Sequence, residues 1–350
     1  MTAALVTGAP GWLGTRLVRI LAEGLPDLPE FSAGSDREIR VLALRGVDLS
    51  PLRAIGGPVR IVPGDVTDPA TLAPFFDGAA DATLFHAAGV IHPTLGVRQF
   101  YAVNEGGTRH VVDAAARAGV RRMVHVSSNS PFGVNRDARE LFDEASPYRP
   151  YMNYGRSKKT AEDIVNEAGR AGAIETVIVR PPWFYGPDQP ERQTRFFRMI
   201  QSGKMPLVGS GENRRSMAYV DNICQALLLA ERVPHANGRS YWIADARPYT
   251  MNEILATIES VLEDDFSIPV AHRRRRLPSV VAEVAWALDA AVQGTGRYIP
   301  EIHVLSEMNK TIACRIDRAR AELGYDPKVD LREGMRRSVQ WMIEHGIALS

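Results

Sequence analysis

The first 180 residues alternate between two kinds of segment, and this alternation limits the chain to few folds. Short apolar runs rich in Val and Ile are separated by longer stretches whose apolar residues recur every three or four positions. Such runs form buried strands, and such stretches form amphipathic helices. The predicted strands are residues 3–7, 40–44, 59–62, 82–86, 123–127 and 176–180, and the predicted helices include 13–23, 103–118 and 155–171. Repeated strand-helix-strand units predict an α/β fold with a doubly wound parallel sheet.

The second half of the chain follows a different pattern. After Pro181 the alternation fades and Pro and Gly become frequent. Helical segments are predicted at 194–201, 220–232 and 251–262, with short strands between them. A chain of 350 residues suits one large α/β unit with a smaller lobe. We therefore predict a first domain over 1–180 and a C-terminal lobe over 181–350, some of whose segments return to the first domain. Residues 24–37 are predicted to be a surface insertion.

Composition and charge exclude several classes of protein. Hydrophobic residues make up 45% and charged residues 24% of the chain, which excludes disordered, collagen-like and disulfide-stabilised chains. The formal net charge is +1, so no overall field attracts nucleic acid. Cys224 and Cys314 stand far apart, which gives no zinc or disulfide pattern and favours a reducing compartment. Without a leader-like start or an apolar run of about 18 residues, we expect a cytoplasmic protein with no transmembrane segment.

A glycine-rich turn follows the first predicted strand and opens the first helix. It reads TGAPGWLG over residues 7–14, with glycines at Gly8, Gly11 and Gly14. The first glycine permits a tight turn, the second lets backbone approach a pyrophosphate, and the third lets the helix pack on the strand. Amide groups at the helix start would then meet the phosphates. The turn predicts a Rossmann-type dinucleotide-binding domain, although incidental glycines in a strand-to-helix turn would read the same way.

The ends of the second and third predicted strands bear on the choice of dinucleotide. An acid at the end of the second strand binds the ribose 2′-hydroxyl of NAD, whereas a basic group accommodates the 2′-phosphate of NADP. Arg45 stands there and favours NADP, while nearby Asp48 leaves NAD open, and Arg45 could also be a solvated arginine. After the third strand, Asp65 could accept a hydrogen bond from an adenine amino group while Val66 packs on the ring. Asp65 could equally cap a helix.

Three further elements carry the chemistry. His86 to Gly89 follow the fourth predicted strand, Ser127 and Ser128 follow the fifth, and Tyr154 and Lys158 open the next helix. A spacing of four places Tyr154 and Lys158 on one helical face. A neighbouring ammonium can lower the pKa of a phenol towards the range of a useful acid or base. The set suits proton transfer to or from a secondary alcohol while hydride passes to a nicotinamide. The histidines show no metal-ligand spacing, and a GxSxG elbow is absent.

These motifs resemble those of the extended short-chain dehydrogenases/reductases, the NAD(P)-dependent epimerase/dehydratase group. The resemblance covers nearly the whole chain. Residues 7–14 match TGxxGxxG, 103–108 match the NxxGT helix start, 126–133 match SSxxxYG, and 180–187 match RPxxxYGP. It implies that Tyr154 is the general acid or base, that Lys158 binds the nicotinamide ribose and tunes Tyr154, and that Ser128 polarises the reacting oxygen. Phe132 departs from the pattern, because several members carry a tyrosine there.

The resemblance also implies the residues that contact the ligands. Those expected at the cofactor are Gly8, Gly11, Trp12, Leu13, Gly14, Arg45, Asp65, Val66, Ala87, Ala88, Gly89, Asn104, Ser127, Tyr154, Lys158, Pro181 and Phe184. Those expected at the substrate are Ser128, Phe132, Trp183, Tyr185 and Arg215. We expect no metal ligand. A homodimer is common in the family and is expected here.

The C-terminal half bears on the branch of the family. Arg215 matches the arginine that binds the diphosphate in sugar-nucleotide epimerases and dehydratases, but Asn213 and Asn222 match the 3β-hydroxysteroid dehydrogenase branch equally well. The long stretch between residues 250 and 327 favours the latter, since that branch typically has an inserted helix. Here the helix is predicted over 277–292, with Val281, Val284, Ala285, Leu288 and Val292 on one face.

Four consecutive arginines, residues 273–276, precede this helix. They predict a peripheral contact with an anionic membrane, unless they form a solvated run beside a core helix.

From the motifs and the resemblance together, we expect an NAD(P)-dependent oxidoreductase that acts on an apolar small-molecule substrate. The alternatives are a sugar-nucleotide epimerase or dehydratase with tightly held NAD, and a non-catalytic dinucleotide sensor.

Overall fold

The computed structural model describes residues 2–25, 27–137 and 139–349. Seven parallel strands form its central sheet in the order β11-β6-β5-β4-β1-β2-β3. These strands are β1 (Ala4–Thr7), β2 (Ile39–Ala43), β3 (Val59–Pro63), β4 (Thr83–His86), β5 (Arg122–Val126), β6 (Glu175–Arg180) and β11 (Arg239–Trp242). The chain order reverses beside β1, which lies between β2 and β4. In such sheets ligands bind at the carboxyl ends of the strands beside this reversal.

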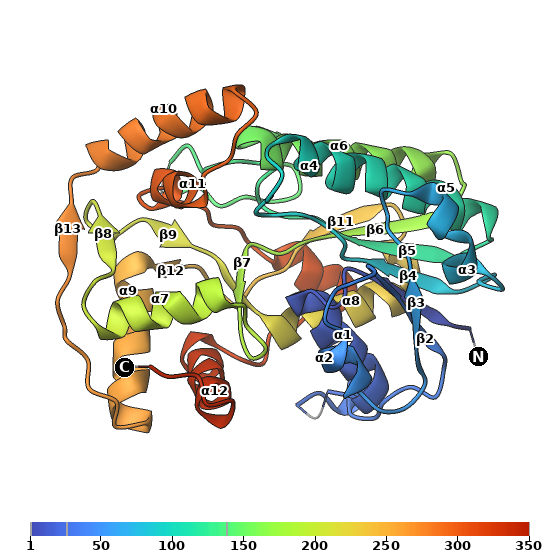
Figure 1. The fold of residues 1–350 in the computed structure, drawn as a ribbon, viewed down its shortest axis with the longest axis horizontal. Coiled ribbons are helices and arrows are strands. Elements are labelled where there is room, and N and C mark those ends of the chain that lie inside the picture. The colour runs from blue at the N-terminus through green and yellow to red at the C-terminus, as the bar shows by residue number, and fades with distance from the viewer. Residues whose placement is uncertain (1, 26, 138, 350) are drawn as a thin grey trace.

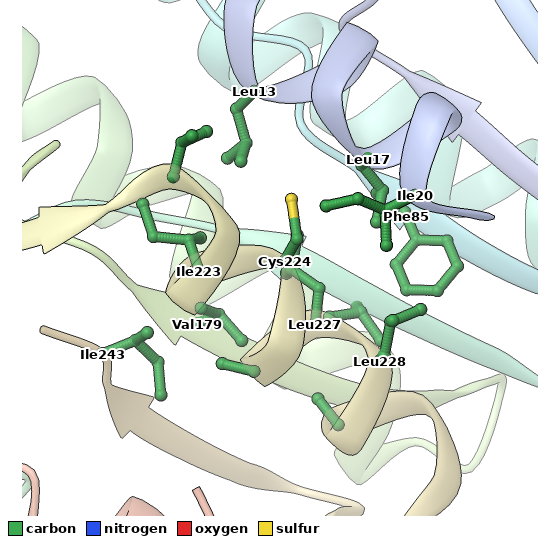
Figure 2. Packing of buried hydrophobic residues seen from close by; sticks show 14 of the residues in the cluster. Leu13, Leu17, Ile20, Phe85, Val179, Ile223, Cys224, Leu227, Leu228 and Ile243 are labelled. Atoms are coloured by element: carbon green, nitrogen blue, oxygen red, sulfur yellow. The ribbon is translucent and has the colours of Figure 1, made fainter. Parts of the chain in front are cut away.

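Helices cover both faces of the sheet, as Figure 1 shows. α5 (Thr108–Arg117) and α6 (Met152–Arg170) lie on one face, and α1 (Trp12–Glu23) and α8 (Val220–Arg232) on the other. Figure 2 shows how α8 packs, with Cys224 between Leu17 of α1 and Val179 of β6. The doubly wound, Rossmann-type α/β fold predicted from the sequence is confirmed.

The expected elements match the structure closely within the first 180 residues, with two differences. The predicted helix 103–118 is α5 preceded by α4 (Arg98–Phe100) and a π-helical segment, Tyr101–Gly107. The predicted surface insertion 24–37 has most of its described residues exposed or half-buried, but Leu25, Leu28 and Phe31 are buried and pack against the core. Leucine and phenylalanine supply enough apolar area to hold this segment on the protein despite its prolines and glycines.

The second half of the chain contributes to both parts of the molecule. α8 and β11 complete the large sheet layer, with Arg239–Trp242 pairing parallel to β6. The smaller lobe contains three two-stranded sheets. Its elements are β7 (Trp183–Tyr185), α7 (Glu191–Gln201), β8 (Pro206–Val208), β9 (Arg214–Arg215), β10 (Met217–Tyr219), β12 (Tyr249–Thr250), α9 (Met251–Ser260), β13 (Arg275–Leu277) and α12 (Leu331–Glu344). Short turns of helix complete the fold at Pro29–Phe31, Ser50–Arg53, Pro69–Thr71, Ala73–Phe76, Pro234–Ala236, Val261–Asp265 and Ala319–Leu323.

The inserted helix of the C-terminal half is α10 (Val280–Gly294), followed by α11 (Pro300–Glu307). The sequence placed Val284 and Leu288 on the same apolar face as Ala285, but only Ala285 of these is buried. The buried face of α10 carries Ala282 and Ala285 together with Asp289 and Gln293, while the larger apolar side chains Val284 and Leu288 are exposed. Within the described residues, no helix combines the length and the apolar character needed to span a membrane.

Candidate active site

The glycine turn between β1 and α1 is too crowded for side chains. Gly8 has a φ of +94°, and a Cβ there would lie 2.4 Å from the carbonyl carbon of Ala87. A Cβ on Gly14 would lie 2.5 Å from the carbonyl oxygen of Gly8. Gly11 is the N-cap of α1 and offers no side-chain cap, so first-turn amides of the helix stay free for an anion. These residues fit the pyrophosphate of a dinucleotide.

Aromatic side chains join this turn to the segment after β6. The Trp12 indole N–H donates to the carbonyl oxygen of Pro187 at 2.6 Å, and its ring centroid lies 4.8 Å from that of Phe184. Leu13 and Pro181 are buried behind them. Four of the residues predicted to contact the cofactor, from two distant parts of the chain, therefore lie at one edge of the sheet.

The residues expected at the adenosine half lie at the ends of β2 and β3. Arg45 is exposed just after β2. Asp48 accepts a hydrogen bond from the Ser50 N–H at 2.9 Å, which closes a turn. Asp65 accepts bonds from the N–H and the hydroxyl of Thr67, both at 2.8 Å. The helical turn that follows is capped by Asp68 rather than by Asp65, so the helix-cap alternative for Asp65 is wrong. Val66 is buried beside it.

The loop after β4 is fixed by hydrogen bonds within the protein. The Ala88 N–H donates to the Thr7 hydroxyl at 3.3 Å, and Ala87 and Gly89 flank it as half-buried and exposed residues. Asn104 is fully buried and holds the loop through the N–H of Val90 at 2.7 Å and its carbonyl oxygen at 3.0 Å. Both side-chain N–H groups of Asn104 are used, since the second donates to Ser157 at 3.0 Å. The side chain of Asn104 is therefore suited to holding the loop after β4 in place.

The three predicted catalytic residues converge at the end of β5 and the start of α6. Ser128 follows β5 and is 7% exposed. Tyr154 is half-buried in α6, and burial raises the pKa of its phenol to about 12, although contact with the Ser128 hydroxyl acts in the opposite direction. Lys158 is 3% exposed and donates to the carbonyl oxygen of Val126 at 2.8 Å. Burial lowers the pKa of Lys158 to about 8, against an opposing effect of Glu162.

The arrangement can hold and move a proton at a substrate oxygen. A Tyr154 phenol with a raised pKa is protonated at neutral pH, so it can donate to a carbonyl oxygen. The Ser128 hydroxyl is close enough to the phenol to lower its pKa, and it also lies 3.4 Å from Oδ1 of Asn129 and from the Ser130 hydroxyl. Ser127 contributes differently, because its N–H donates to the carbonyl oxygen of Val179 at 2.7 Å while its buried hydroxyl has no partner among the described residues.

The structure separates the five residues predicted at the substrate. Ser128 lies beside Tyr154, and Trp183 is half-buried on β7, with its ring 5.3 Å from Phe196. Arg215 donates to the carbonyl oxygen of Glu307 at 2.5 Å, and its Nε has no partner within the described part of the chain.

The two remaining predicted substrate residues belong to the core. Tyr185 is 0% exposed and its hydroxyl donates to Asp245 at 2.7 Å, while Phe132 is 1% exposed against Tyr148 and Trp242. Neither side chain is exposed in this structure, so neither is included in the proposed substrate site. Tyr185 is the last residue of β7 and Phe132 lies in a turn after β5, and the sequence did not reveal that both side chains face the core.

Several residues near Tyr154 were not predicted. The ring of Phe100 lies 5.7 Å from that of Tyr154, and Tyr298 packs edge-on against Phe100 at 5.5 Å. The Tyr298 hydroxyl is 2.9 Å from Nδ1 of His92. Arg192 of α7 is close enough to lower the pKa of Tyr154 electrostatically. No local sequence signal marks these residues, because their proximity depends on the packing of α7 and of the α10–α11 segment.

The chain is similar to known proteins over most of its length. Residues 4–244 match the model of the NAD dependent epimerase/dehydratase family. The uncharacterized protein y4nL of Sinorhizobium fredii is 50% identical over 98% of this chain and 95% of its own length. The 2-alkyl-3-oxoalkanoate reductase of Shewanella oneidensis is 26% identical over 95% of this chain and 84% of its own. The structure of DesIV, a dTDP-glucose 4,6-dehydratase from Streptomyces venezuelae with NAD and TYD bound, is similar with a TM-score of 0.72 at 25% identity, covering 98% of this chain and 97% of DesIV.

Proposed function

Because the chain belongs to the NAD dependent epimerase/dehydratase family, we propose that this nicotinamide-dependent enzyme interconverts a secondary alcohol and a ketone on an apolar substrate. The observation that carries the proposal is the convergence of Ser128, Tyr154 and Lys158 beside the glycine turn. The bound nicotinamide supplies or accepts the hydride. The named similarity to a 2-alkyl-3-oxoalkanoate reductase supports an apolar ketone as the substrate class.

Tyr154, Ser128 and Lys158 would each have a different role in the reaction at the substrate oxygen. The Tyr154 hydroxyl gives its proton to the oxygen as the ketone is reduced, and the Ser128 hydroxyl holds the same oxygen by a hydrogen bond. Lys158, held by the Val126 carbonyl oxygen, places an ammonium one turn away, which stabilises the phenolate that remains. The raised pKa of Tyr154 keeps its phenol protonated at neutral pH, which is the form that donates to a ketone oxygen.

The choice between NAD and NADP is part of the proposal. Arg45 is exposed at the end of β2, where a 2′-phosphate would lie. The nearest acid, Asp48, already accepts the N–H of Ser50 and its hydroxyl. We therefore favour NADP.

A contact with an anionic membrane is also proposed. Most of the exposed large apolar side chains gather on α10, α11 and their neighbouring loops, namely Ile91, Leu95, Val280, Val284, Trp286, Leu288, Ile299 and Val304. Arg273, Arg275 and Arg276 are exposed at the start of this surface, and none of the three forms an ion pair within the described residues. Apolar groups flanked by cations favour the surface of an anionic bilayer. The expected homodimer and cytoplasmic location stay proposals, supported by the family resemblance and the two free cysteines.

A second candidate function is a sugar-nucleotide epimerase or dehydratase. The observation that favours it is the unpartnered Nε of Arg215, a cationic donor near the site that could hold a diphosphate. This alternative uses the same Ser128, Tyr154 and Lys158, but it regenerates its NAD within each turnover.

The nucleotide that the purified protein releases on denaturation distinguishes the two functions. We expect protein that releases little nucleotide on denaturation, binds NADPH and reduces alkyl ketones. In the same assay Tyr154→Phe should lose turnover by about a thousandfold, since general acid catalysis contributes about that much, while NADPH affinity changes less than about twofold. Tightly retained NAD would favour the second function, and turnover retained by the variant would remove Tyr154 from the mechanism.

A further inference from the structure

The helix that carries Tyr154 does not cap its own start. α6 begins at Met152, which has a φ of +49°, and its N-cap Tyr151 makes no side-chain cap. First-turn amides have no partner within their own helix. Here the N–H of Asn153 donates to Oε1 of Gln293 at 3.3 Å, and the Asn153 side-chain amide donates to the same oxygen at 2.9 Å. The cap therefore comes from α10, 140 positions further along the chain.

A buried carboxylate sets the orientation of this Gln293 side chain. Nε2 of Gln293 donates to both oxygens of Asp289, at 2.9 and 3.0 Å. A carboxylate can only accept, so the amide nitrogen must face Asp289 and the amide oxygen must face α6. His303 of α11 is the second partner of Asp289, at 2.7 Å. Burial lowers the pKa of His303, but the hydrogen bond to Asp289 and the negative charges of Glu307 and Asp289 together raise it above its ordinary value.

The α10–α11 segment also touches the catalytic helix at other points. The Tyr151 and Ser306 hydroxyls lie 2.6 Å apart, and Tyr298, between the two helices, packs on Phe100 behind the ring of Tyr154. Figure 1 shows α10 and α11 beside the start of α6. Asp289 and Gln293 are 0% and 4% exposed, so water cannot replace these bonds, and losing one leaves a buried polar group without a partner.

We propose that Gln293 is a positioning residue for the reaction, which caps the catalytic helix from outside and fixes the place of Tyr154. The inference rests on the proposed function. It also accounts for the inward polar face of α10. A displaced phenol loses its alignment with the substrate oxygen, and misplacements of about 1 Å can cost about a hundredfold in rate.

Gln293→Met tests the proposal, because methionine has a similar length but neither donates nor accepts these bonds. We expect kcat to fall at least about tenfold, with NADPH affinity changed less than about twofold because the glycine turn lies elsewhere. Ala291→Gln is the matched control, since Ala291 lies on the exposed face of the same helix, and it should keep the wild-type kcat. An equal kcat in Gln293→Met and the control would overturn the proposal.

Asn153→Ala provides a second variant that changes the partner on α6. It removes the side-chain bond to Gln293 and the bond that Asn153 accepts from the Tyr101 hydroxyl at 2.7 Å, but it keeps the backbone N–H bond. We expect kcat to fall less than in Gln293→Met, and the double variant to lose less than the sum of the two single losses, because both changes remove the shared side-chain bond. Additive losses would contradict a shared role. If Gln293→Met does not fold, Gln293→Ala removes the same acceptor, and a wild-type kcat in that variant refutes the proposal by itself.

Hydrogen exchange separates this inference from the proposed function. The peptide that spans residues 151–156 should exchange at least about tenfold faster in Gln293→Met than in wild type, while Ala291→Gln should match wild type. This readout needs no substrate. Faster exchange without turnover in any variant would mean that the cap exists but the proposed reaction is wrong, whereas unchanged exchange would refute the cap.

Discussion

Lys158 is buried as a cation, and the cost of that burial should appear in the pH dependence of stability. Its pKa is about 8 in the folded protein and 10.5 in the reference state. Between these values the unfolded chain binds more protons than the native protein, so stability rises with pH. The two pKa values give a cost of roughly 3 kcal/mol near pH 7 and roughly 1 kcal/mol near pH 9.5. The wild type should therefore gain roughly 2 kcal/mol across this interval from this group.

Lys158→Met removes the titrating group and keeps an apolar stem of similar length. The variant should lack the 2 kcal/mol rise and should lose turnover, because no ammonium then stands near Tyr154. The assay is urea unfolding of both proteins near pH 7 and near pH 9.5, and only the difference between them is used, so that other titrating groups cancel. Lys159→Met is the matched control, since the Lys159 side chain is 36% exposed, and it should follow the wild-type pH dependence. Parallel curves for wild type and Lys158→Met would refute the reasoning.

Two further variants test the ligand preferences. Arg45→Glu should shift the ratio of NADPH to NADH affinity towards NADH by at least about tenfold, because a carboxylate repels the 2′-phosphate; an unchanged ratio would remove Arg45 as the phosphate ligand. The pair Val284→Asp and Leu288→Asp should abolish sedimentation with phosphatidylglycerol vesicles, while wild type should bind these and bind phosphatidylcholine vesicles only weakly. Equal sedimentation of variant and wild type would contradict a membrane contact through α10.

The large sheet could be predicted because its signals are local. Each of its first six strands is a short run that contains apolar side chains, and four of them contain two or more of Val and Ile. The glycine turn could likewise be predicted from its motif. The structure gives the physical reason for the glycines, because a Cβ at Gly8 or Gly14 would collide with backbone atoms. The packing of residues 24–37 could not be predicted, because prolines and glycines mark a loop and do not say what lies against it.

In the second lobe, the sequence did not show which face of each strand or helix is buried in the core. An apolar residue in a short strand is predicted as buried, but the strand does not say whether it faces a pocket or the core. Tyr185 therefore looked like a wall of the substrate site, and the structure places its hydroxyl on Asp245. Similarly, the apolar pattern of α10 did not reveal its buried face, which carries Ala282 and Ala285 together with Asp289 and Gln293 and contacts α6 and α11 through hydrogen bonds.

Phe132 stands where several family members carry a tyrosine, and its neighbours explain why the tyrosine hydroxyl can be absent in this chain. Phe132 stacks on Tyr148 with ring centroids 4.6 Å apart, and the Tyr148 hydroxyl donates to Glu162 at 2.6 Å. Arg180 binds the same carboxylate at 2.6 Å and lies 4.6 Å from the centre of the Phe132 ring. A tyrosine hydroxyl at residue 132 is therefore not required to satisfy Glu162, since Tyr148 and Arg180 already do so. The carboxylate so held lies one turn beyond Lys158 in α6 and opposes the effect of burial on the pKa of Lys158, which favours the ammonium form that the proposed function assigns to this residue.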